Sequence, residues 1–197
     1  MRKRSPRATI DVLGSTMYYE DRGEGTAFVF LHGNPTSSPL WRHVLPRIEG
    51  PVRVPAPDLI GMGRSGKPGG EYAFADHARY LDAWFDAAGL DEVVLVGQDW
   101  GGALAFDRAA RHPGRVRGIA FMETIVRPKG WVPKLLLTFD GSPALMVGAE
   151  AAAWCERNIS ALESEYCGAA AHLCPEDRPE EIAAAVNAWA ARHALAG

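Results

Sequence analysis

The sequence contains no apolar run long enough to cross a membrane, and its basic residues 2–4 are followed by Ser5-Pro6-Arg7 instead of an apolar stretch. A secretory signal needs such a stretch and a membrane helix needs a longer one, so we expect neither. Charge of one sign is not in excess either, because 21 Lys and Arg side chains stand against 24 Asp and Glu, for a net charge of −3. This balance predicts no general attraction to nucleic acid or to anionic membranes.

Cysteine is scarce, and Cys155, Cys167 and Cys174 are an odd number without the spacing of metal ligands. We therefore expect free thiols and a cytoplasmic location, with no metal site. Internal repeats and low-complexity segments are also missing. The length of 197 residues, with 47% hydrophobic and 23% charged residues, predicts one globular domain over residues 1–197.

Apolar and amphipathic segments alternate along the chain. Because strands that alternate with helices form a parallel sheet covered on both faces, we predict an α/β fold with a mostly parallel, twisted sheet and helices on both faces. Strands are expected at residues 9–12 and 16–21 (a hairpin around Gly14), 27–31, 52–57, 93–98, 116–122, 134–139 and 162–167, and helices at 40–48 (interrupted by Pro46), 75–88, 100–111, 150–159 and 180–193.

The segment Gly97-Gln98-Asp99-Trp100-Gly101-Gly102 follows an apolar β-branched run and leads directly into a helical pattern. Strand, sharp turn and helix in this order are typical of a nucleophile elbow, here with aspartate where hydrolases usually have serine. An aspartate is already an anion at neutral pH, so Asp99 can displace a leaving group directly and form an ester of the enzyme. The alternative is that Asp99 only caps the helix.

A base and an orienting acid can be placed by chain order. His172 follows the last predicted strand, where an α/β hydrolase carries its catalytic base. Glu123 and Asp140 each follow a predicted strand, and either carboxylate could accept a hydrogen bond from the histidine Nδ1–H. We favour Glu123 and keep Asp140 as the alternative acid; each could instead be an ordinary solvated loop residue.

Asn34 lies directly after a predicted buried strand, in His32-Gly33-Asn34-Pro35. Its backbone N–H could pair with that of Trp100 to form an oxyanion hole. The Asn34 side-chain amide and the Trp100 indole N–H are neutral donors that carry no acid. Such donors suit a halide leaving group, which departs as a stable anion and needs no proton. The alternative is a turn residue and a core tryptophan.

Residues 32–38, 58–68 and 97–102 together resemble the haloalkane dehalogenases of the α/β-hydrolase superfamily. The resemblance extends from about residue 10 to residue 128 and resumes near residue 132. The acid position matches the subfamily that places it after the sixth strand; another subfamily places it near Asp140. The resemblance implies Asp99 as nucleophile, His172 as base, Glu123 as acid, and Asn34 with Trp100 as halide ligands.

Three features depart from the family pattern. Gln98 stands where histidine is common, and Leu173-Cys174-Pro175 follows the base where an aromatic residue and a more regular segment are usual. The family also inserts a multi-helix cap domain between Glu123 and Lys134, where only residues 124–133 are present here. We therefore expect an α/β-hydrolase core without a helical cap.

The resemblance implies cleavage of small haloalkanes to alcohol and halide through an alkyl-aspartate ester, with water as co-substrate and no cofactor. Loss of the cap predicts weak turnover and self-association through an uncovered apolar face near Trp100, Val126, Trp131 and Val132. One alternative is an epoxide hydrolase, which uses cap tyrosines to protonate the epoxide oxygen. Another is a catalytically inactive core or binding scaffold.

Overall fold

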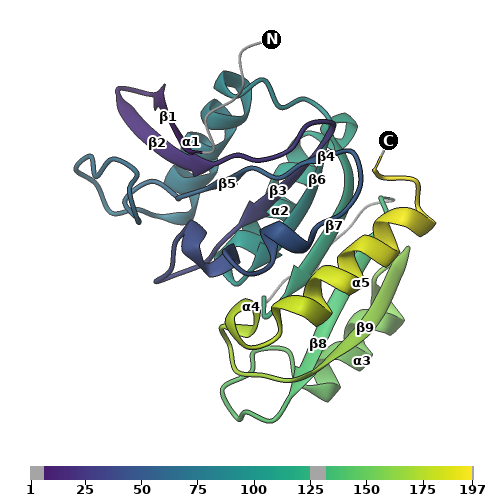
Figure 1. The fold of residues 1–197 in the computed structure, drawn as a ribbon. Coiled ribbons are helices and arrows are strands. Elements are labelled where there is room, and N and C mark those ends of the chain that lie inside the picture. The colour runs from purple at the N-terminus through teal and green to yellow at the C-terminus, as the bar shows by residue number, and fades with distance from the viewer. Residues whose placement is uncertain (1–6, 125–131, 197) are drawn as a thin grey trace.

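A computed structural model describes residues 7–124 and 132–196. Its main sheet has six parallel strands in the order β4-β3-β6-β7-β8-β9, and a smaller antiparallel sheet has the order β1-β2-β5 (Figure 1). The strands are β1 (Arg7–Val12), β2 (Ser15–Glu20), β3 (Thr26–Leu31), β4 (Val52–Arg53), β5 (Ala56–Pro57), β6 (Val93–Gln98), β7 (Val116–Met122), β8 (Lys134–Asp140) and β9 (Leu162–Ala169). The helices are α1 (Phe74–Ala87), α2 (Trp100–Arg111), α3 (Ala149–Asn158), α4 (Cys174–Asp177) and α5 (Pro179–Arg192), with 3-10 turns η1 (Ser38–Trp41), η2 (Leu45–Arg47) and η3 (Pro113–Arg115).

Both faces of the main sheet are covered, which confirms the predicted α/β arrangement. Alternate residues of a strand point to opposite faces, so Val93 and Leu95 of β6 join the core beneath α1, α2 and α3, whereas Val94 and Val96 join the core beneath α5. Figure 1 shows α5 on the side of the sheet opposite α3. Every residue of β6 is buried, as expected for a central parallel strand.

Two expected elements differ from the structure. The helix expected at residues 40–48 is replaced by η1 and η2, each of which has a proline in its first turn. The strand expected at 52–57 divides into β4, which pairs with β3, and β5, which pairs with β2 in the small sheet. Proline lacks the N–H that a continuous helix or ladder requires, and prolines occur in both segments. The short helix α4 was not expected.

Only residues 123–133 connect β7 to β8, which is too short a connection for a multi-helix cap domain. Residues 125–131, including Val126 and Trp131, lie outside the described part of the chain. The three cysteines are free, as predicted, and all three are buried. The cytoplasmic location stays a prediction. In the part that the structure describes, no helix has the length and apolar character needed to cross a membrane.

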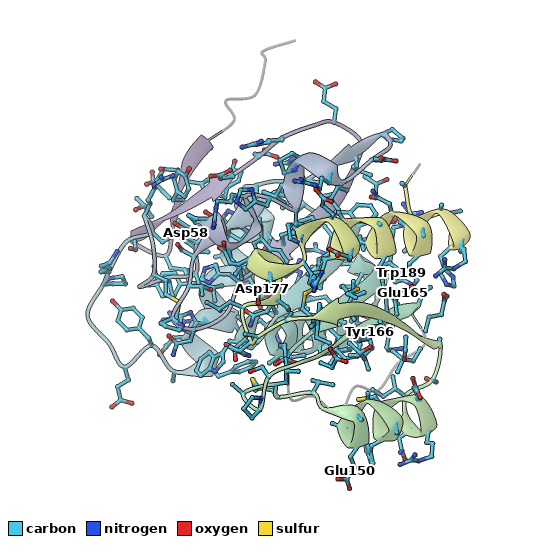
Figure 2. All side chains as sticks on the ribbon, turned by 60° about the horizontal axis from the view of Figure 1, so that its bottom comes forward. Asp58, Glu150, Glu165, Tyr166, Asp177 and Trp189 are labelled. Atoms are coloured by element: carbon cyan, nitrogen blue, oxygen red, sulfur yellow. The ribbon has the colours of Figure 1, made fainter. Side chains whose placement is uncertain are left out.

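The carboxyl ends of the parallel strands lie at one edge of the main sheet. In register, Leu31 pairs with Gly97 and Gln98 with Met122, so the segments that follow β3, β6 and β7 emerge side by side. Parallel sheets gather their functional groups at this edge. The last strand in the order, β9, forms one lateral edge of the main sheet. Its residues Glu165 and Tyr166, labelled in Figure 2, are exposed.

A buried histidine fixes the loop that follows β3. His32 is fully buried; its Nδ1 lies 2.9 Å from the Gly33 carbonyl oxygen, and its Nε2 accepts the Leu59 N–H at 2.9 Å. The Asp58 carboxylate, labelled in Figure 2, accepts the neighbouring N–H groups of Ser38 (2.6 Å) and Arg64 (2.7 Å). Burial lowers the pKa of His32, which keeps Nε2 free to accept.

We predict that this histidine makes folding stability depend on pH. Because the folded pKa lies below the unfolded value of about 6.5, the unfolded chain binds the extra proton first, and stability falls as the pH drops below about 6.5. One proton can contribute at most about 1.4 kcal/mol per pH unit. Urea denaturation at pH 7.5 and 5.5 measures the loss. His32→Gln, which keeps an acceptor but does not titrate, should lose less stability over this interval; an equal loss in both proteins would contradict the assignment.

Candidate active site

Asp99 occupies a strained turn between β6 and α2. Its backbone has φ +52° and ψ −126°, a conformation that non-glycine residues rarely adopt. Although Asp99 is the N-cap residue of α2, its carboxylate makes no capping hydrogen bond. The geometry is that of the predicted elbow, and it leaves the carboxylate available to other partners.

Close packing around this turn requires glycine at two positions. A Cβ atom on Gly101 would lie 2.0 Å from the Leu31 carbonyl oxygen, so only glycine lets α2 begin beside the end of β3. A Cβ atom on Gly33 would lie 2.2 Å from Asp99 Oδ1. The loop after β3 can therefore approach the carboxylate closely enough for its backbone to contact it.

The Asp99 carboxylate lies between a backbone donor and an imidazole. Oδ1 accepts the Asn34 N–H at 2.9 Å, and Oδ2 lies 3.7 Å from His172 Nε2. The Asp99 side chain is 11% exposed and the His172 side chain 26% exposed, so both can be reached by a small molecule. The structure thus brings together three predicted site residues from distant parts of the chain.

Glu123, rather than Asp140, contacts the histidine. Its Oε2 lies 3.3 Å from His172 Nδ1, and its carboxylate accepts the N–H groups of Met146 (2.8 Å) and Val147 (3.2 Å). Glu123 is 1% exposed and has φ +48°, so the carboxylate is fixed inside the protein. Asp140 is exposed; it is hydrogen-bonded to Tyr166 and thereby raises the pKa of that phenol.

Trp100 begins α2 and is half-buried among aromatic rings. Its ring lies 5.6 Å from that of His77, edge to face, and 5.9 Å from that of Phe74. Trp100 and Asn34 together line a cavity of about 570 Å³, which Tyr72 and His77 also line. Burial lowers the pKa of His77. A separate cavity of about 660 Å³ lies beside α3 and is lined by residues such as Ser142.

The side chains of Gln98 and Asp177 contact His172 and the residue before it, and neither contact was anticipated from the sequence. The Gln98 side-chain Nε2 lies 3.2 Å from His172 Nε2 and 3.0 Å from the His172 carbonyl oxygen. Asp177 of α4, labelled in Figure 2, accepts the Ala171 N–H at 2.8 Å and so anchors the residue before the histidine. The departure at position 98 from the family pattern was the only sequence signal, and Asp177 had none.

Among the residues that the structure describes, no three His, Cys, Asp or Glu side chains gather as the ligands of a metal ion. The groups that converge on Asp99 are an imidazole and a backbone N–H, and Glu123 lies behind the imidazole. A carboxylate placed in this way can attack a carbon centre, and the imidazole beside it can accept a proton from water.

Residues 26–185 match the alpha/beta hydrolase fold family. A haloalkane dehalogenase from Mesorhizobium japonicum is 55% identical over 123 residues, which cover 62% of this chain and 40% of that protein. One from Sphingobium indicum is 53% identical over 127 residues, or 62% of this chain and 43% of that protein. The chain thus matches about two fifths of the length of these curated relatives.

Solved structures give the same likeness over more of the chain. The haloalkane dehalogenase DbeA from Bradyrhizobium elkani has a TM-score of 0.89 at 30% identity, covering 97% of this chain and 99% of that one. DatA from Agrobacterium tumefaciens, also a haloalkane dehalogenase, has a TM-score of 0.88 at 29% identity, covering 95% and 96% of the two chains.

We predict that Glu123 stabilises the fold in addition to orienting His172. Glu123→Gln replaces one carboxylate oxygen with an NH₂ group that would face a backbone N–H of residues 146–147. An unpaired buried donor costs about 1–3 kcal/mol, and we expect the free energy of unfolding to fall by that amount in urea denaturation. Asp140→Asn, at an exposed position, should change it by less than about 0.5 kcal/mol. Equal effects of the two substitutions would contradict the buried role of Glu123.

Proposed function

The chain belongs to the alpha/beta hydrolase family, and from this premise we propose that it is a hydrolytic dehalogenase that converts small haloalkanes to alcohol and halide. The likeness to haloalkane dehalogenases in sequence and in structure supports this reaction class. The observation that carries the proposal is the Asp99 carboxylate, which lies between the Asn34 N–H and the His172 imidazole.

In the first step, the Asp99 Oδ2 atom attacks the halogen-bearing carbon. A C–O bond forms as the C–halogen bond breaks, and the halide leaves with the electron pair. The Asn34 amide and the Trp100 indole N–H hold the departing anion. Oδ1, which already accepts the Asn34 N–H at 2.9 Å, becomes the carbonyl oxygen of the alkyl ester. The backbone N–H groups of Asn34 and Trp100 then form the oxyanion hole for the next step.

In the second step, His172 Nε2 takes a proton from water, and the resulting hydroxide attacks the ester carbonyl carbon. Glu123, 3.3 Å from Nδ1, stabilises the imidazolium. The tetrahedral intermediate collapses and expels the alkoxide, which takes the proton from the imidazolium and leaves as alcohol. Asp99 then releases its remaining proton to solvent. The balanced reaction consumes one water and yields alcohol, halide and a proton.

We propose that residues 1–197 form one domain, an α/β-hydrolase core without a cap domain. Turnover is expected to be slow because no cap covers the site. Electrostatic stabilisation is strongest where water is excluded, and an open site forfeits part of it. A small apolar substrate also loses much of the enclosing surface that would bind it. These two losses reduce the rate of ester formation and the affinity for substrate, without changing the order of the chemical steps.

Epoxide hydrolysis is the weaker alternative. It requires a donor that protonates the epoxide oxygen, and Tyr72 is the tyrosine that lines the cavity beside Asn34 and Trp100. The Tyr72 hydroxyl already donates to the Pro68 carbonyl oxygen at 2.5 Å, so it is engaged elsewhere. An inactive core or binding scaffold is the other alternative, and an activity assay separates it from both hydrolases.

The proposal predicts two different failures in a halide-release assay on short bromoalkanes. Asp99→Ala should release no halide, because the nucleophile is gone. His172→Ala should release about one halide per enzyme and then stop as the alkyl ester, because attack on carbon does not require the base. Mass spectrometry should show the added alkyl group. Repeated turnover by His172→Ala would exclude His172 as the base, and a wild type no better than Asp99→Ala would favour the inactive core.

We also propose that the uncapped face mediates self-association. Val126 and Trp131 lie outside the described residues, but Phe74 beside Trp100 is 36% exposed and Leu173 beside His172 is 39% exposed. Light scattering should show a mass that rises with concentration, and Phe74→Ser with Leu173→Ser should reduce the rise. A monomer at high concentration would rule this association out.

A further inference from the structure

Gln98 is placed where it can control the imidazole of His172. It is the last residue of β6, lies beside Asp99 in sequence and is 1% exposed. Its position on a fully buried central strand, in register with Met122 of β7, fixes its backbone. The Gln98 amide therefore extends from a buried strand toward the loop that carries the histidine.

The orientation of this amide is set by its partners. The Gln98 Nε2 atom lies 3.0 Å from the His172 carbonyl oxygen, which can only accept a hydrogen bond. The atom at this position must be the NH₂ group, because a reversed amide would bring two acceptor oxygens together. The same nitrogen lies 3.2 Å from His172 Nε2 and has a second hydrogen to donate. His172 Nε2 is consequently an acceptor.

An accepting Nε2 determines where the single proton of the neutral ring lies. That proton is on Nδ1, which faces Glu123 Oε2 at 3.3 Å. Both ends of the imidazole are thus bound by side chains that are only 1% exposed, Gln98 at one end and Glu123 at the other. This tautomer leaves the basic lone pair on Nε2, the ring nitrogen that lies 3.7 Å from Asp99 Oδ2.

We propose that Gln98 is a positioning residue that holds His172 in the Nδ1–H tautomer and so keeps the basic nitrogen directed at the Asp99 ester. Its effect on the hydrolytic step rests on the proposed function. When Nε2 takes a proton from water, it can no longer accept from Gln98. The bond to the His172 carbonyl remains and keeps the loop in place through the step.

The unpaired end of the amide supports this role. Gln98 Oε1 is buried and has no hydrogen-bond partner within the described part of the chain. A buried acceptor without a partner is unfavourable, and its cost offsets part of what the two hydrogen bonds of the same amide contribute to stability. The amide is thus satisfied only at the end that contacts His172, which favours a role toward the histidine over a role in packing.

The test compares the wild type with Gln98→Met, which keeps the length and removes both donors. Met122→Leu, a change in the neighbouring buried side chain, is the packing control. Nitrogen-15 spectra of labelled histidine should show Nδ1–H for His172 in the wild type and in Met122→Leu, and a mixture of tautomers in Gln98→Met. Urea denaturation should show that Gln98→Met and Met122→Leu both unfold at urea concentrations close to that of the wild type.

Single-turnover measurements with a bromoalkane separate the two chemical steps. In Gln98→Met, halide release in the first turnover should stay within about twofold of the wild type, whereas ester hydrolysis should slow about tenfold, the effect of one hydrogen bond. The alkyl-enzyme should then accumulate. A merely structural role would slow both steps together and lower stability, which would overturn the proposal.

The two proposals fail in different ways. An unchanged Nδ1–H tautomer in Gln98→Met overturns the role of Gln98, even if the wild type dehalogenates normally. A wild type that forms no alkyl-enzyme overturns the dehalogenase function, and the nitrogen-15 spectra still decide whether Gln98 fixes the ring.

Discussion

The close approach of α2 to the end of β3 is the constraint on which the site depends. Gly101 lies where any side chain would collide with the Leu31 carbonyl oxygen, and Gly33 lies directly against Asp99. Because both are glycine, the loop after β3 can present the Asn34 N–H to the carboxylate at 2.9 Å. His32, fully buried in the same loop, accepts a hydrogen bond from the Leu59 N–H and so holds the loop in position.

The charged groups of the site differ sharply in their surroundings. Glu123 contacts two backbone N–H groups and the histidine, so both of its oxygens are engaged. Asp99 is partly exposed and, within the described residues, accepts from one backbone donor at Oδ1, which leaves Oδ2 available for the role of nucleophile that we propose. The difference in hydrogen bonding suits the two carboxylates to the different roles that we propose for them, Glu123 as the fixed partner of His172 and Asp99 as the nucleophile.

Much of the fold could be predicted from the sequence because 93–98 begins with an unbroken apolar run, typical of a buried strand, and 100–111 follows with a helical pattern. Residues 38–57 could not, because their prolines favour short turns and two brief strands that pair with different sheets. Chain order placed Asp99, His172 and Glu123 at one sheet edge. The contact of Gln98 escaped prediction because an amide's partners depend on the position of a loop 74 residues away in sequence.

The two borders of the main sheet bear on how copies of this chain can meet. Exposed strand edges invite strands of other molecules to pair with them, and proteins discourage this with very short or charged edges. One border, β4, is only two residues long. The other, β9, exposes Glu165, and Glu163 on the same strand is bound to Arg192 and His193 of the neighbouring helix end. Growth of a continuous intermolecular sheet is therefore disfavoured at both borders of the main sheet.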